Sequence, residues 1–302
     1  MQQDSTEMHL GWNVVKRLFQ VGVIGCFMLL CSCATEKTVR RQLPADVTLS
    51  KNAGRGGLIF VTLRLGIGEE LPFVVDTGAA RTLLDISFEP KLGNRLGTAN
   101  IDHSGARYKG GIFTAPKLYL DGVPLVTASN IGTYDFKNQL TSRAGKQVRG
   151  ILGMDCLKHY CIQLDFEAGK LRFLDPDHLN VEKLGKAFPI TISSPGGRPF
   201  IHHVSLTGGT STNSLIDTGC NFDGRAEKDA LQGDDKGWVH LPECAWDGGN
   251  YTNLTVQIGE HANLLGLRFL ARHLVTLDFP NRTLYLKQTS VGPLKNENNK
   301  QQ

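Results

Sequence analysis

FVVDTG at residues 73–78 and SLIDTG at residues 214–219 are the stretches that decide the fold. In both, an apolar run leads directly into Asp-Thr-Gly, and an alternating strand with a glycine turn precedes it. Ile59–Gly78 aligns with Phe200–Gly219 without a gap. Alternation, a glycine turn and a second apolar run predict a β-hairpin. The chain therefore contains an internal duplication in which each copy carries the same tripeptide.

A second pair of segments extends the duplication. Ile151-Leu152-Gly153 matches Leu264-Leu265-Gly266, and the Leu-Asp-Phe at 164–166 matches the one at 277–279. A turn and a closing strand follow each Leu-Asp-Phe, and short helices are expected near Met154–Tyr160 and Leu267–His273. The pattern predicts an all-β fold with two similar β-barrel-like lobes, each with one short helix.

Length and composition agree with two lobes. The 302 residues suggest about two domains, and 40% hydrophobic content is ordinary for a chain that buries a core. The net charge is only +4 and no basic block is present, so we expect no nucleic-acid partner. We divide the chain into a lipoprotein-type signal peptide (1–33), a tether (34–53), an N-terminal lobe with Asp76 (54–185), a C-terminal lobe with Asp217 (186–287) and a disordered tail (288–302).

The N-terminal segment has the pattern of an export signal. Lys16 and Arg17 precede the apolar run Leu18–Leu30, which is shorter than the roughly 20 residues of a membrane span. The Leu-Cys-Ser-Cys that follows resembles a bacterial lipoprotein signal, with Cys33 as the lipidated first mature residue. A plain signal peptide and an uncleaved anchor are the alternatives, and all three place the body of the protein outside the cytoplasm. The lipoprotein interpretation predicts a membrane-anchored protein of the bacterial envelope, and Ala34 favours the outer membrane.

Four cysteines remain beyond the signal, namely Cys156, Cys161, Cys220 and Cys244. An even number in an exported protein permits two disulfides, and closeness in sequence favours Cys156–Cys161 and Cys220–Cys244. Buried free thiols are the alternative.

We expect no metal and no cofactor. The cysteines lack a CxxC spacing, which structural zinc sites usually have. His202 and His203 are adjacent on an expected strand, with His202 on the inward phase, so their side chains should point to opposite faces.

The two aspartates carry the chemistry. Water attacks a peptide carbonyl only when a base takes its proton and an acid protonates the carbonyl oxygen. Two carboxyls held about 3 Å apart share one proton, so one can serve as base and the other as acid. Asp76 and Asp217 are therefore the candidate catalytic pair.

The residues beside the aspartates have supporting roles in this hypothesis. Gly78 and Gly219 allow tight turns whose N–H groups reach the carboxylates. Thr77 and Thr218 are expected to hydrogen-bond across an approximate two-fold axis and to keep the loops rigid.

With these motifs the chain resembles the pepsin and retropepsin superfamily of aspartic peptidases over about residues 55–287. The resemblance implies a bilobal pepsin-like fold and an aspartic endopeptidase, monomeric because one chain supplies both aspartates. It also implies a peptide or protein substrate bound in extended form between the lobes. A hairpin over the cleft would fall at Thr98–Phe113, with Tyr108 as the candidate flap residue; an ordinary loop tyrosine is the alternative.

The motif departs from the pepsin pattern at one position in each copy. Ala79 and Cys220 stand where pepsin-like enzymes usually have Ser or Thr. A missing hydroxyl removes a hydrogen bond that favours the ionised carboxylate, so the pair should titrate at higher pH than in pepsin. Two further functions remain open: a catalytically silent peptide-binding or inhibitor lipoprotein of the same fold, and a structural envelope lipoprotein.

Overall fold

The computed structural model describes residues 42–103, 106–139, 147–194, 196–203, 206–207, 213–227, 233–234, 236–259 and 263–295. The signal segment, with Leu18–Leu30 and Cys33, lies outside these residues, so export and lipid anchoring stay predictions. Among the described residues, no helix is both long enough and apolar enough to span a membrane. Contacts divide the chain after Gln42, and the description below concerns the unit that begins at Leu43.

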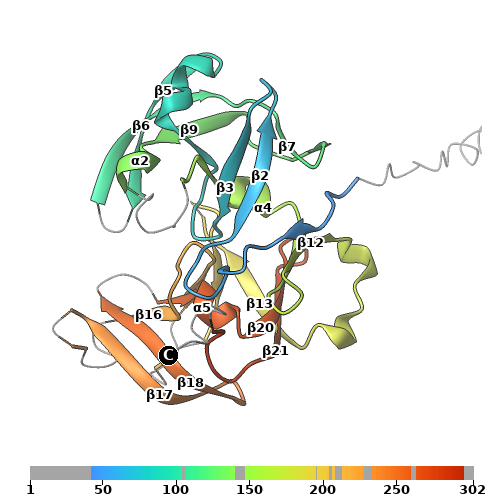
Figure 1. The fold of residues 1–302 in the computed structure, drawn as a ribbon, viewed down its shortest axis with the longest axis vertical. Helices are drawn as coiled ribbons and strands as arrows, with labels where there is room; N and C mark the ends of the chain where they lie inside the picture. The colour runs from blue at the N-terminus through green and yellow to red at the C-terminus, as the bar shows by residue number, and fades with distance from the viewer. Residues whose placement is uncertain are drawn as a thin grey trace, which may run out of the picture. The chain divides into compact units, whose positions relative to one another are not determined.

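The strands of the described part form two sheets (Figure 1). The nine-stranded sheet comes from the N-terminal half and has the order β5 (Arg95–His103), β6 (Ala106–Thr114), β9 (Asn130–Tyr134), β4 (Leu83–Asp85), β10 (Gly150–Leu152), β3 (Glu70–Val75), β2 (Phe60–Leu65), β7 (Leu118–Leu120), β8 (Val123–Pro124). The twelve-stranded sheet has the order β1 (Val47–Thr48), β12 (Lys170–Leu174), β11 (Cys161–Asp165), β20 (His273–Asp278), β21 (Thr283–Gln288), β13 (Lys186–Ile192), β14 (Pro199–Ile201), β15 (Ser214–Asp217), β19 (Leu264–Gly266), β16 (Gly224–Glu227), β18 (Gly249–Gly259), β17 (Trp238–Trp246).

Helices are few and short. The α-helices of the described residues are α2 (Phe136–Gln139), α4 (Met154–Leu157) and α5 (Leu267–Leu270), and the 3₁₀ helices are η1 (Ile86–Lys91), η2 (Pro176–His178) and η3 (Val181–Lys183). The two predicted helices correspond to α4 and α5, and both end earlier than expected. The N-terminal half has α2 in addition.

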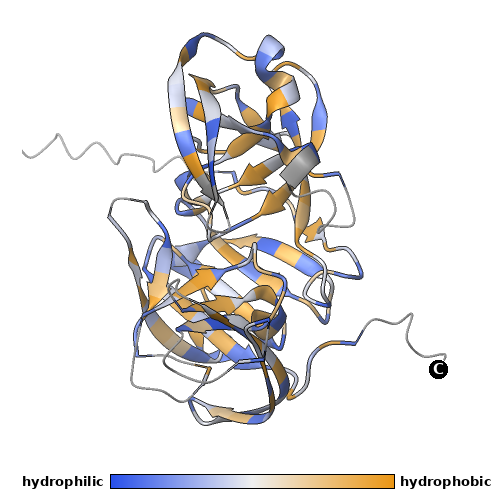
Figure 2. Ribbon diagram, turned by 90° about the vertical axis from the view of Figure 1, so that its left-hand side faces the viewer, coloured by the Kyte–Doolittle hydropathy of each residue, from blue (hydrophilic) through white to orange (hydrophobic). Residues whose placement is uncertain are grey.

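Alternating burial explains why the first hairpin forms. Val61, Leu63 and Leu65 of β2 are buried, whereas Thr62 between them is exposed. Gly68 turns the chain with a φ of +106°, a conformation that favours glycine. Figure 2 shows the hydrophobic segments mainly on the strands, and the connections between them are largely hydrophilic. The hairpin thus buries one face and exposes the other.

The duplication is visible in the strand pairing. β3 runs parallel to β10, and β15 runs parallel to β19, so each Asp-Thr-Gly strand lies beside its apolar-apolar-Gly partner. In both halves this partner also pairs with the strand that follows the motif, β4 in the first and β16 in the second.

The two copies meet at β11 and β20, which pair antiparallel. In the repeat, Gln163 corresponds to Thr276, and these two residues are also direct partners across the strands. Their buried side chains are joined by a hydrogen bond from Gln163 Nε2 to Thr276 Oγ1 at 3.0 Å. The approximate two-fold axis that relates the halves therefore passes through this pair.

The ungapped alignment of the first strands is wrong by one residue. Phe60 pairs with Val74, but Phe200 pairs with Leu215, so the second hairpin has one residue more between its paired positions. This shift makes the inward assignment of His202 wrong as well. β14 ends at Ile201 and His203 has a φ of +58°, so alternation stops before the histidines. Half-buried His202 hydrogen-bonds Thr191 Oγ1 and Asn213 Oδ1 through its two ring nitrogens.

Ordered chain extends beyond the predicted segment limits. β1 lies inside the predicted tether and pairs with β12. At the other end, Thr289 N and Ser290 N donate to the Arg272 carbonyl at 2.8 and 3.0 Å. Residues 47–48 and 288–291 therefore belong to the folded body.

The predicted disulfides are absent: the four cysteines of the described residues are thiols. Burial raises the pKa of Cys161 to about 12, and Cys220 Sγ and Cys244 Sγ approach the carbonyls of Phe222 and Leu206 instead of each other. Closeness in sequence does not align the Cβ vectors that a disulfide requires.

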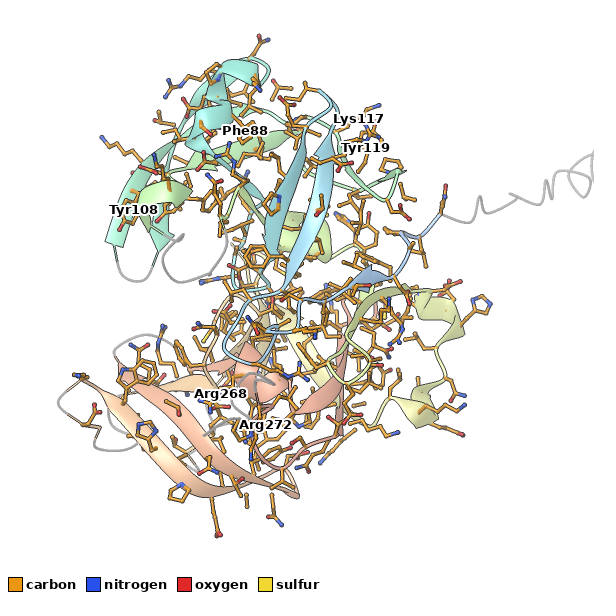
Figure 3. All side chains as sticks on the ribbon, in the orientation of Figure 1. Phe88, Tyr108, Lys117, Tyr119, Arg268 and Arg272 are labelled. Carbon is orange, nitrogen blue, oxygen red and sulfur yellow. The ribbon has the colours of Figure 1, made fainter. Side chains whose placement is uncertain are left out.

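A buried ion pair anchors the C-terminal segment. Arg272 and Asp223 are both fully buried, and Arg272 Nη2 lies 2.7 Å from Asp223 Oδ1. Arg272 Nη1 also donates to the carbonyls of Thr252 and Val291 at 2.8 and 3.0 Å. Figure 3 labels Arg272 beside Arg268, which lies on α5. One guanidinium thus joins β18, α5 and the chain after β21.

We expect Arg272→Met to lower the free energy of unfolding by about 3–5 kcal/mol, because it removes the closer of the two guanidinium partners of buried Asp223 and leaves only Arg268 Nη1 at 3.6 Å. Urea unfolding followed by tryptophan fluorescence measures the change. Lys91→Met is the control, since it removes the exposed ion pair to Glu69 and should shift the midpoint little. Equal effects of the two variants would contradict the anchoring role.

Candidate active site

Each candidate aspartate lies where an apolar strand ends and a tight turn begins. Asp76 follows β3, and Asp217 is the last residue of β15. Asp76 Oδ1 accepts hydrogen bonds from Gly78 N at 2.8 Å and from Ala79 N at 3.0 Å. Asp217 Oδ1 accepts one from Gly219 N at 2.9 Å. The turn itself therefore fixes the orientation of each carboxylate.

The two loops are locked together by a reciprocal set of hydrogen bonds. Thr77 N donates to Thr218 Oγ1 at 3.0 Å, and Thr218 N donates to Thr77 Oγ1 at 3.1 Å. Each hydroxyl then donates across to the other copy, Thr77 Oγ1 to Ile216 O at 2.6 Å and Thr218 Oγ1 to Val75 O at 2.8 Å. Both threonines are fully buried, so these groups have no water to replace a lost partner.

Each carboxyl packs against the glycine of the opposite loop. A Cβ built on Gly219 would lie 2.4 Å from Asp76 Cγ, and one built on Gly78 would lie 2.5 Å from Asp217 Oδ1. Real Cβ atoms do not approach other atoms so closely, so only glycine fits at these two positions. The structure thus brings together the six residues predicted for the two Asp-Thr-Gly loops, namely Asp76, Thr77, Gly78, Asp217, Thr218 and Gly219.

The pair has the electrostatics of two carboxyls that share a proton. Burial raises the pKa of Asp76, and the neighbouring charge of Asp217 raises it further. Burial raises the pKa of Asp217 as well, whereas the hydrogen bond from Gly219 N and the charges of Arg225 and Arg198 act in the opposite direction. The arginine charges favour the ionised form of Asp217, and the two carboxyls titrate as one pair around a shared proton. Both residues retain some solvent-accessible surface, so a water molecule can reach them.

Arg225 and Arg198 were not predicted from the sequence. Arg225 lies on β16 between the buried residues Gly224 and Ala226, so its side chain points to the opposite face of the strand. Arg198 lies immediately before β14 and is exposed. The alternation of β16 in the sequence could have placed Arg225 on the outer face. Only the sheet order brings that face beside Asp217.

The predicted flap hairpin exists, but its role is untested. β5 and β6 pair antiparallel, with Ile101 opposite Tyr108. Tyr108 is half-buried on β6 (Figure 3). Its ring meets the Tyr134 ring edge-on at a centroid distance of 5.4 Å. A covering role for Tyr108 stays a prediction, and the predicted lipidation site Cys33 lies outside the described residues. Among those residues, no group of three or more His, Cys, Asp or Glu side chains is placed to hold a metal.

Comparison with solved structures identifies the fold. The structure matches an aspartic proteinase from Irpex lacteus with a TM-score of 0.53 and 16% sequence identity, covering 82% of this chain and 97% of that one. No protein-family model and no curated protein matches the sequence. The predicted all-β, pepsin-like fold is confirmed by this structural match.

We expect Asp76→Asn to stabilise the protein at neutral and higher pH. The pKa of Asp76 is higher in the folded than in the unfolded state, so its contribution to stability is complete below the unfolded value and is lost as pH rises through the folded value. Asparagine keeps the acceptor for Gly78 N and cannot ionise. At pH 8 the gain should be at least about 1.4 kcal/mol, the equivalent of one pKa unit, and it should vanish near pH 3.

Urea unfolding of both proteins between pH 3 and 9 measures this difference. Asp223→Asn is the control, because it removes the partner of a buried guanidinium and should destabilise the protein. A difference between Asp76→Asn and wild type that does not change with pH would contradict the raised pKa.

Proposed function

We propose that the chain is an aspartic endopeptidase that hydrolyses peptide bonds with water activated between Asp76 and Asp217. The single observation that supports this proposal best is the reciprocal packing of each carboxyl on the opposite glycine, within loops joined by the two threonines. A structural turn needs neither the close approach of two carboxyls nor a shared proton. The arrangement keeps two carboxyl groups buried side by side, which costs stability. Carboxyl groups with pKa values shifted in this way are typical of catalytic sites.

In the proposed mechanism, Asp217 is the base and Asp76 is the acid. Ionised Asp217 takes a proton from the water molecule, and the water oxygen attacks the peptide carbonyl carbon. Protonated Asp76 donates its proton to the carbonyl oxygen, which gives a neutral tetrahedral diol. Asp217 then gives its proton to the leaving nitrogen and Asp76 takes a proton from one diol hydroxyl, which breaks the C–N bond and yields a carboxylic acid and an amine. The backbone donors Gly78 N, Ala79 N and Gly219 N hold both carboxyls in place throughout.

The direct test is cleavage of a quenched fluorescent peptide library and of a denatured protein by the purified chain. We expect cleavage by the wild type and a loss of at least about 10³-fold in kcat/KM in Asp76→Asn and in Asp217→Asn. Asp121→Asn is the matched control, because Asp121 lies in an exposed turn with a φ of +47°, which asparagine tolerates.

The possible outcomes separate the rival functions. Peptide binding without cleavage in the wild type would favour a silent binding protein of the same fold. Neither binding nor cleavage would favour a structural protein. Cleavage that persists in both Asn variants would overturn the catalytic assignment of the pair.

A second prediction concerns the pH optimum. Ala79 N already donates to Asp76 Oδ1, and a serine hydroxyl at position 79 would add a donor beside the same carboxylate. This donor favours ionisation, so Ala79→Ser should move the bell-shaped profile of kcat/KM to lower pH by about 0.5–1 unit. Ala115→Ser, half-buried on a distant segment, is the control. An unchanged profile, or a shift to higher pH, would contradict the role of the missing hydroxyl.

A further inference from the structure

One face of the C-terminal half carries a continuous row of paired residues. The register runs through Phe200, Leu215, Leu264, Arg225, Gln257 and Trp238, from β14 to β17. Directly paired residues point to the same face of a sheet, so these six side chains share one face. Leu215 lies two residues before Asp217 on β15, so the same face carries the Asp217 carboxylate.

This face is separate from the main hydrophobic core. Leu215, Leu264 and Cys220 form a small cluster of their own, with Phe200 and Phe222 packed at its side. The residues that alternate with them, such as Ile216 and Leu265, point into the main core. The ring of Phe222 meets the ring of Trp238 edge-on at 5.0 Å. An apolar floor with half-buried aromatic edges thus extends away from Asp217.

Arg225 stands within this row and forms no ion pair with any described residue, although its charge acts on Asp217. Its Nε donates to Gln257 Oε1 at 3.4 Å, and no ion pair in the described part of the chain includes Arg225 or Arg198. Glu227 lies two residues farther along β16 and is exposed, but it forms no ion pair with Arg225. Half-buried guanidinium groups usually have a carboxylate or phosphate partner, so the position suits an incoming anion.

Arg198 adds a second positive charge on the other side of Asp217. Since Phe200 pairs with Leu215 in an antiparallel register, extending the register by two residues places Arg198 at the level of Asp217. Arg198 thus lies beside β15 on one side and Arg225 two strands away on the other, and both charges lower the pKa of Asp217.

The corresponding row of the N-terminal half is apolar. It runs through Phe60, Val74, Ile151, Leu83, Gly132 and Ile112. Leu83 holds the place that Arg225 holds in the other copy. Arg81, two residues before Leu83, is a basic residue on that side, but it is exposed and donates to Asn130 Oδ1 at 2.6 Å. The N-terminal copy thus serves as an internal reference, because its row contains no counterpart of the Arg225 charge.

We propose that Arg225 selects peptides that carry an acidic side chain on the side of the scissile bond that lies over the C-terminal half. This inference rests on the proposed endopeptidase function. Arg225 lies two strands from β15, a distance of roughly 10 Å, which an extended peptide spans in about three residues. The acidic residue is therefore expected within about three positions of the cleaved bond, and Arg198 provides additional attraction for it.

The test uses fluorescent peptides with Glu or its neutral isostere Gln at each of four positions on either side of the scissile bond. At one position on one side, the wild type should cleave the Glu peptide at least about 10-fold faster in kcat/KM than the Gln peptide, mainly through a lower KM. This ratio should fall toward one in Arg225→Gln and should be retained in part in Arg225→Lys. Arg225→Glu should instead prefer a peptide with Lys at the same position. Arg64→Gln, a half-buried arginine that lies over the Tyr119 ring in the N-terminal half, should keep the wild-type ratio.

The outcomes separate this proposal from the function on which it rests. Cleavage of Glu and Gln peptides at equal rates by the wild type would overturn the acidic preference and leave the endopeptidase function standing. An acidic preference that Arg225→Gln retains would also overturn the assignment to Arg225. Failure of the wild type to cleave any peptide, with Asp76→Asn indistinguishable from it, would count against the endopeptidase function itself.

Discussion

The exchange of hydrogen bonds between Thr77 and Thr218 is the constraint on which the centre of the molecule depends. Each threonine uses its amide, its hydroxyl hydrogen and its hydroxyl oxygen toward the opposite copy, at distances of 2.6–3.1 Å. In a buried site these bonds must be made together or not at all, because an unsatisfied group costs about 1–3 kcal/mol. The position of each carboxyl follows from this link, since it lies one residue before the threonine.

A symmetric frame and an asymmetric site coexist in this arrangement. The loops, the glycines and the threonines obey the two-fold relation, but the groups around them do not. Arg225 and Arg198 act on Asp217, whereas Leu83 holds the place of Arg225 in the first copy, so positive charge favours ionisation on the Asp217 side. In the proposed mechanism this bias assigns the role of base to Asp217 and the role of acid to Asp76. Local charge supplies the bias without disturbing the hydrogen bonds that position the pair.

The sequence predicted the features that both copies share and missed those that only one copy has. Two Asp-Thr-Gly tripeptides after apolar runs, with matching Leu-Gly and Leu-Asp-Phe segments, were sufficient for the fold, both short helices and the residues that meet at the axis. The extra residue in the second hairpin could not be predicted from the sequence, because a glycine turn can change in length without a change in composition. The disulfides failed because spacing along the chain says nothing about side-chain direction. Arg225 was missed because its neighbourhood depends on strand order, which joins residues far apart in sequence.

Gln163 and Thr276 hold equivalent positions in the two copies and face each other across the two-fold axis. If two separate, identical chains formed this interface, the position would present glutamine to glutamine or threonine to threonine. Once both copies reside in one polypeptide, a long amide donor can instead meet a short hydroxyl acceptor, and each can be fitted to the other. Further substitutions can then accumulate independently on the two sides of this interface.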